Sequence, residues 1–168
     1  ICLPLVASGQ WSENGRPVED VPWRRSDGPF GAMLLITDEW LAFEEAWDHP
    51  PSSDYRPHIS TTETAARGDT VSIVILFQGC QANPSGACQA LADFRIVKPD
   101  GSVYADHPGA PLWSETPPRP GHLQLGAAQL HFEIEPNDPI GRYAIEVRAR
   151  DMVAIRNVAL VQHLEVIE

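Results

Sequence analysis

With 168 residues, 43% of them hydrophobic, the chain is long enough to bury one continuous core, which argues against wholesale disorder. The net charge of −11 leaves few basic groups to neutralise phosphates, so nucleic acids and anionic membranes are poor partners. No run approaches the ~18 consecutive apolar residues of a membrane-spanning helix, so we expect no membrane span.

The first segment, ICLPLVASGQ, is typical of the end of a signal peptide. An apolar run leads to Ala7 and Gly9, small residues at the positions three and one before a cut at Gln10. We therefore interpret residues 1–9 as a signal-peptide remnant and expect a periplasmic or secreted protein. The alternative interpretation is that this segment is an N-terminal strand of the mature fold.

The next segment, residues 10–29, is polar and proline-bearing and shows no hydrophobic periodicity. This composition predicts a flexible leader. Two tryptophans, Trp11 and Trp23, stand out in it. We interpret them as packing on the flank of the domain, and the alternative is a pair that faces a ligand.

Residues 30–66 combine a strand and a helix. The apolar run FGAMLLI has the length of a strand, and the following TDEWLAFEEAWDHPP begins with capping residues and ends at two prolines. Within it Trp40, Phe43 and Trp47 fall on one helical face, which we interpret as a docking face. We expect this segment to be an extension packed on the domain that follows.

From residue 67 onward the chain reads as short strands separated by turns. Residues 71–77 are apolar at nearly every position, which predicts a central strand covered on both faces. The later runs alternate apolar and polar residues, with no helix signal between them. This pattern predicts an antiparallel β-sandwich, and residues 67–168 match the ~100 residues of an immunoglobulin-like domain.

The turn DPIGRY carries a more specific signal. A tyrosine just after a corner, two residues before an inward apolar position, matches the tyrosine corner of immunoglobulin-like folds. We expect Tyr143 to bond backbone near Asp138. Ile145 occupies the place where antibody domains have a cysteine, so the antibody inter-sheet disulfide is absent.

The order of these segments resembles a family. GPFGAMLLITDEWLAFEEAW, RGDTVSIVILFQGC, DFRIVKPDGSVYAD and IEPNDPIGRYAIEVRARD, followed by a final apolar strand, look like a group of uncharacterised exported bacterial proteins. The resemblance covers about residues 28–168, and its most specific pieces are LFQGC and DPIGRY. It implies an immunoglobulin-like sandwich and an exported protein, and it implies no activity.

Cys80 and Cys88 flank a Pro-Ser-Gly turn with seven residues between them. This is not the CxxC spacing of a redox motif, and there is no second pair for a zinc site. We expect a disulfide that closes a loop between two strands, at one end of the domain. Free thiols in a cytoplasmic protein, or a redox or metal role, are the alternatives.

Four loop histidines, His49, His58, His107 and His122, raise a metal hypothesis, because imidazole and carboxylate ligands suit zinc or copper. None has a neighbour at ligand spacing, so we expect neither a metal nor another cofactor. The chain also lacks the nucleophile-elbow, HExxH and phosphate-cradle motifs, so we expect no enzyme.

The segment DHPGAPLWSETPPRPGH is long for a sandwich connection, and long loops are often functional. In it Trp113 could stack on a sugar or anchor a protein, or it could belong to an edge strand that covers the core. Our candidate binding residues are Trp113, Tyr104 and His107.

The sequence thus favours a non-enzymatic exported module that contacts an envelope protein or a polysaccharide through the loops at one end of a sandwich. One alternative is a carbohydrate-binding module that uses Trp113 or Trp23. The other is a metal-binding protein or metalloenzyme that uses the loop histidines.

Overall fold

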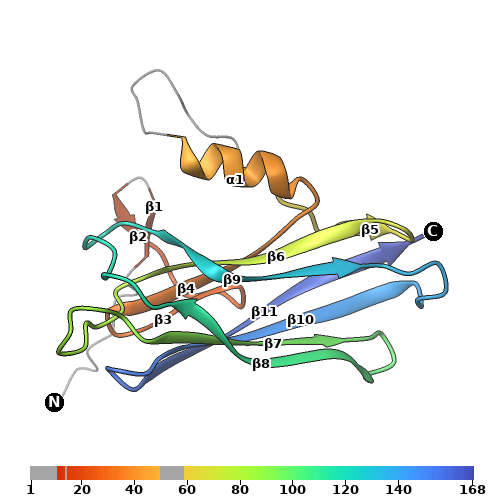
Figure 1. Ribbon diagram of the computed structural model, residues 1–168. Coiled ribbons are helices and arrows are strands. Elements are labelled where there is room, and N and C mark those ends of the chain that lie inside the picture. The colour runs from red at the N-terminus through yellow and green to blue at the C-terminus, as the bar shows by residue number, and fades with distance from the viewer. Residues whose placement is uncertain (1–10, 14, 50–58) are drawn as a thin grey trace, which may run out of the picture.

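The computed structural model describes residues 11–13, 15–49 and 59–168, and it is mainly β, as predicted (Figure 1). The predicted signal-peptide remnant, residues 1–9, lies outside the described residues. The strands are β1 (Ser12–Glu13), β2 (Arg16–Pro17), β3 (Arg24–Asp27), β4 (Phe30–Thr37), β5 (Thr64–Ala66), β6 (Thr70–Gln78), β7 (Ala90–Val97), β8 (Val103–Trp113), β9 (Gln124–Glu133), β10 (Gly141–Asp151) and β11 (Arg156–Ile167).

The strands form two face-to-face layers (Figure 1). One sheet has the order β5-β11-β10-β7-β8, and the other has the order β3-β4-β6-β9. Neighbouring strands are antiparallel except β5, which runs parallel to β11. The short strands β1 and β2 pair with each other outside the two sheets.

The core lies between the sheets because the inward residues of each strand alternate with polar ones. In β10, Tyr143, Ile145 and Val147 are buried in the core, whereas Glu146 between them is half-buried and the flanking Arg142 and Arg148 are exposed. Since successive strand side chains point to opposite faces, this alternation places one apolar face against the other sheet. The predicted sandwich layering is therefore present.

Strand β6 is covered on both faces, as its continuous apolar run predicted. Ile73 and Ile75 belong to the main core, while Val74 and Leu76 lie under the helix α1 (Trp40–Asp48). The helix docks through Phe43, which is 1% exposed. No helix in the described part of the chain is long and apolar enough to cross a membrane.

The aromatic stripe of α1 forms its contact with the sheet. The ring of Phe43 lies between those of Trp40 and Trp47, with centroid distances of 5.8 and 6.5 Å. The rings of Trp40 and of His131 in β9 also contact each other edge to face, with their centroids 6.0 Å apart. The docking-face interpretation of this stripe is confirmed.

We expected the sandwich to begin at residue 67, with residues 30–66 as an extension packed on it. This was wrong for the first strand of that extension, β4. β4 pairs with β6 from Gly31 opposite Gln78 to Thr37 opposite Ser72, so it is a strand of the four-stranded sheet. Its residues Phe30 and Leu34 are fully buried in the main core. Of the helix and strands described within residues 30–66, only α1 lies outside the sheets, because β5 pairs with β11 in the five-stranded sheet.

The leader prediction also fails for the described part of residues 10–29, which packs on the sandwich. Trp11 is 6% exposed and its ring covers Gly31. The guanidinium carbon of Arg24 lies 5.8 Å from the ring centroid of Trp11 and 5.2 Å from that of Trp23. Cation–π contacts of this kind favour a fixed arrangement of the segment.

One end of the sandwich, which we call the corner end, holds the turn between β9 and β10. Here the hydroxyl of Tyr143 donates to the carbonyl oxygen of Pro139 at 2.9 Å, which confirms the predicted bond near Asp138. The Asp138 carboxylate is buried and accepts from the Tyr104 hydroxyl at 3.1 Å and from the Glu135 amide at 2.9 Å. Buried polar groups of this end are thus partnered by local backbone and side chains.

Candidate functional site

The opposite end, which we call the loop end, consists of the β3–β4 turn, residues 79–89, residues 114–123 and the β10–β11 turn (Figure 1). Backbone hydrogen bonds join three of these segments. The Cys88 amide donates to Glu115 at 2.8 Å, and the Met152 amide donates to Gln89 at 2.9 Å. Segments far apart in the sequence therefore form one connected surface.

The predicted disulfide is present between Cys80 and Cys88, with 6.0 Å between the two Cα atoms. Both cysteines are buried against the main core. Inside the loop that they close, the Asn83 side-chain oxygen accepts from the amides of Ser85 and Ala87 at 2.9 and 3.1 Å. The loop is therefore held by its own polar contacts as well as by the covalent bond.

Beside this loop lies a depression of about 720 Å³. It is lined by Pro29, residues 78–80 and residues 116–121. Three prolines of the second segment, in the run Pro-Pro-Arg-Pro, contribute to the wall, and the polar side chains of Gln78 and Arg119 join them. Because proline fixes its own φ, this wall has little conformational freedom to lose on binding.

Two of the lining residues, Pro29 and Gly79, bring their backbones into close contact. Gly79 has a φ of 71°, and a Cβ placed on it would collide with the Pro29 carbonyl oxygen. Only glycine combines that left-handed conformation with the absence of a side chain. The sequence offered no signal for this contact, because residues 29 and 79 meet only through the pairing of β4 with β6.

Trp113 does not line the depression but bonds one of the residues that do, Thr116. It ends β8 opposite Ala90, its half-buried ring lies 5.9 Å from that of Phe77, and its Nε1 donates to the Thr116 carbonyl at 3.0 Å. The structure thus has the edge-strand arrangement that we gave as the alternative for this residue. The loop that we expected around Trp113 begins only after it, because β8 extends through residues 103–113.

Tyr104 and His107 lie elsewhere on β8 and do not join Trp113 in one site. Tyr104 is at the corner end, with its ring 4.9 Å from that of Phe132, and His107 is exposed opposite Phe94 in mid-strand. Trp113 pairs with Ala90 at one end of β7, and the neighbours of Tyr104 pair with Ile96 and Val97 at the other end, so about 20 Å of strand separates the two side chains. Burial, and then the hydrogen bond to Asp138, raises the pKa of Tyr104 to about 12.

The described residues contain no group of three or more histidine, cysteine, aspartate or glutamate side chains that could hold a metal ion. His49 follows α1, His107 lies on β8, and the His122 amide donates to Arg119 in the loop end. His58 lies outside the described residues. The described residues therefore give no support to the metal hypothesis, which stays a prediction.

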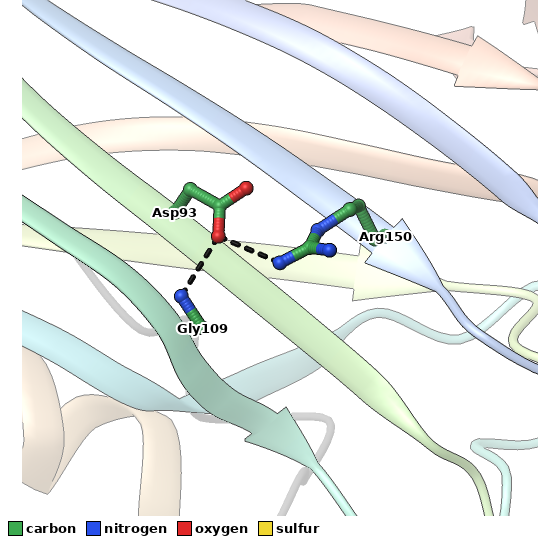
Figure 2. A network of polar contacts seen from close by, with 3 residues as sticks. All are labelled: Asp93, Gly109 and Arg150. Atoms are coloured by element: carbon green, nitrogen blue, oxygen red, sulfur yellow. Dashed lines mark hydrogen bonds and ion pairs between the residues drawn. The ribbon is translucent and has the colours of Figure 1, made fainter.

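The outer face of the five-stranded sheet carries a polar network beside the loop end (Figure 2). The Asp93 Oδ1 accepts from Arg150 Nη2 at 2.7 Å and from the Gly109 amide at 2.8 Å. This carboxylate joins β7 to β8 and β10. Since both charged side chains are about 30% exposed, the ion pair contributes on the order of 0–1 kcal/mol to stability.

Comparisons with known proteins find weak structural similarity. No protein-family model and no curated protein sequence matches the chain. Among solved structures, a family 123 glycoside hydrolase from Clostridium perfringens is similar over 82% of this chain, with 10% identity and a TM-score of 0.46. This chain spans about a quarter of that protein, 27% of its length.

A Niemann-Pick type C2 protein from the Japanese carpenter ant is similar over 62% of this chain and 79% of its own length. The identity is 13% and the TM-score is 0.36. At these values the likeness is confined to the β-rich architecture and carries no argument about activity or ligand.

Proposed function

We propose that this protein is a non-enzymatic, exported binding module that contacts an envelope protein or a polysaccharide through the loop end. The observation that carries this proposal is the depression of about 720 Å³ between the disulfide loop and the Pro-Pro-Arg-Pro wall. Concave, mostly apolar sites with a few polar groups are the usual form of a binding site. Gln78 and Arg119 supply the polar groups here.

The physical basis of the proposal is preorganisation. Ordering a loop or a long side chain on binding costs about 0.5–1.5 kcal/mol for each immobilised side chain. The disulfide between Cys80 and Cys88, the Asn83 turn and the prolines fix this surface before a partner arrives. Because less free energy is then spent on ordering the surface, binding is tighter than it would be with flexible loops.

The disulfide supports the exported location in this proposal. Disulfides persist in oxidising compartments such as the periplasm and the extracellular space, and are rare in the cytosol. The bond between Cys80 and Cys88 is compatible with a periplasmic or secreted protein. A module with fixed surface loops is suited to contacts with components of that compartment.

We also propose that the sandwich is immunoglobulin-like. The support is the strand order, with β11, β10, β7 and β8 in one sheet and β4, β6 and β9 in the other, together with the corner bond of Tyr143. Immunoglobulin-like sandwiches collect loops at their ends, and those loops serve as contact surfaces on rigid sheets.

Site-specific photo-crosslinking tests the proposed function. A photoreactive amino acid is placed at Arg119 in the depression and, as the matched control, at Arg142, an exposed arginine at the corner end. Both variants are expressed in the native host and exposed to light. We expect a discrete adduct from position 119 and none from position 142. Equal adducts from both positions, or none from either, would refute the loop end as the contact surface.

A further inference from the structure

The turn between β10 and β11 displays two apolar side chains at the loop end. Ile155 is 88% exposed and Met152 is 45% exposed. Ile155 also has a φ of 54°, the left-handed region that a β-branched residue rarely adopts. It is the one described residue other than glycine with a positive φ.

Folding alone does not explain an isoleucine at this position. Glycine or asparagine would adopt the left-handed conformation at lower cost, and an exposed apolar side chain gains no burial energy. Strained, exposed residues of this kind are characteristic of functional surfaces when the surrounding structure holds them in place.

The surrounding structure does hold the turn. The buried Asp151 carboxylate accepts from the amides of Val153 and Ala154 through Oδ1, at 3.0 and 3.3 Å. Its Oδ2 accepts from the Gln81 amide at 2.8 Å. One side chain therefore orders the turn and joins it to the disulfide loop. The two apolar residues are presented on a fixed support.

A hollow of about 240 Å³ lies beside them, lined by Met152, Ile155, Asn157, three arginines and Asp151, whose carboxylate is taken up by the amides of the turn and of Gln81. Arg150 is engaged by Asp93 (Figure 2), and Arg156 donates to the Asp27 carbonyl at 3.1 Å. Arg148 is exposed, and within the described part of the chain it forms no ion pair. The hollow therefore offers the exposed guanidinium of Arg148 next to two apolar side chains, on a protein whose net charge is −11.

We propose that this hollow, formed by Met152 and Ile155 with Arg148, docks an extended polypeptide segment in which an apolar side chain neighbours a carboxylate. The apolar side chain would cover Ile155, and the carboxylate would form the charge-assisted hydrogen bonds that a guanidinium favours. An anionic bilayer presents a continuous layer of negative charge, which a net charge of −11 repels, whereas a segment with a single carboxylate needs only the local guanidinium, so a protein segment fits better than a lipid surface. This inference rests on the proposed function, because it adds a second contact to the same loop end.

The test uses a fluorescein-labelled peptide with one leucine–glutamate pair in a run of serine residues, with a twin in which glutamine replaces glutamate. Affinity is measured by fluorescence anisotropy with the full chain. The first variant is Ile155→Asn, since asparagine tolerates the left-handed conformation and should preserve the fold. Its matched control is Ile140→Asn, because Ile140 is 49% exposed at the corner end.

We expect Ile155→Asn to weaken binding of the glutamate peptide about tenfold or more, the effect of losing a central apolar contact. Arg148→Gln should weaken it about fivefold, while its control Arg142→Gln and Ile140→Asn leave it unchanged. The glutamine peptide should bind wild type as weakly as the glutamate peptide binds Arg148→Gln.

Several results would overturn the inference: no binding of the glutamate peptide to wild type, equal binding of the two peptides, or unchanged affinity in Ile155→Asn. Binding of wild type to phosphatidylglycerol vesicles with loss in Ile155→Asn would also overturn it, in favour of a membrane contact. The crosslinking partner captured through position 119 separates the two proposals. If Ile155→Asn still yields that adduct and no peptide binds, the proposed function stands and this inference fails.

Discussion

The two ends of this sandwich are built by different means. At the corner end, the Asp138 carboxylate and the Tyr143 hydroxyl bond the backbone of their own turn, and Asp138 also accepts from Tyr104 on β8. At the loop end, a disulfide, a run of prolines and a buried Asp151 fix segments that come from four places in the sequence. The first arrangement closes the core, and the second leaves a depression and an exposed apolar turn.

This difference shows how one fold separates stability from recognition. The polar groups of the corner end satisfy each other, so little remains there for a partner. The loop end is held by covalent and conformational restraints, which do not consume the exposed side chains of Arg119 and Ile155. Restraints of this kind allow a surface to be rigid while its exposed side chains remain free to contact a partner.

The largest expected effect comes from the backbone approach at the loop end. In Gly79→Ala the new Cβ must collide with the Pro29 carbonyl and the residue must stay left-handed, so we expect a loss of about 3–5 kcal/mol in the free energy of unfolding. Gly101→Ala at the corner end is the control, because Gly101 is also left-handed, with a φ of 85°, but has open space around it. It should lose about 1–2 kcal/mol. Urea unfolding of both variants measures the contrast, and equal midpoints would contradict it.

The next effect concerns the disulfide. Replacing Cys80 and Cys88 together by serine releases a loop of about nine residues in the unfolded chain, so we expect a loss of about 2–3 kcal/mol. Urea unfolding of the double variant, beside wild type under reducing conditions, provides the measurement. The two samples should agree. A double variant as stable as oxidised wild type would show that the loop is held by Asn83 and its neighbours alone.

The smallest effect is a pH dependence at the corner end. The pKa of Tyr104 is raised from its ordinary value of 10.0 to about 12, first by burial and then by its bond to Asp138. A tyrosine is neutral below its pKa, and the unfolded chain releases this proton before the folded protein does. The contribution to stability is therefore complete below pH 10 and is lost as the pH rises from 10 toward 12.

Urea unfolding across this pH range, with ultraviolet titration of the tyrosines, checks the prediction. Wild type should lose stability more steeply than Tyr104→Phe, whose ring keeps the contact with Phe132 but has no proton to release. The control Arg119→Gln, a substitution at the loop end, should leave this pH dependence of stability unchanged. If Tyr104→Phe removes no titration above pH 10, the hydroxyl is not held as the structure indicates.

Features that depend on neighbours in the sequence were predictable. The spacing of Cys80 and Cys88 indicated the disulfide, the turn before Tyr143 indicated its corner bond, and the stripe around Phe43 indicated a docked helix. Each depends on a turn, a cap or a helical period, which the local chain sets by its own conformational preferences.

Features that depend on strand pairing could not be predicted from the sequence. Nothing in residues 30–37 shows that they pair with β6, so the strand was assigned to an extension. Trp113 was placed in a loop because Pro108, Gly109 and Pro111 read as turn residues, although an edge strand with register shifts accommodates them. The position of Tyr104, about 20 Å from Trp113 along the same strand, could not be judged without the strand itself.

The sequence by itself determined that this is a mainly β chain with a closed loop between two cysteines and a tyrosine at a turn. These properties follow from side-chain alternation and turn chemistry over a few residues. Only the tertiary structure decided that Pro29 lies against Gly79, and that the turn carrying Ile155 is joined to Gln81. Such contacts depend on the register of paired strands, which distant segments set together.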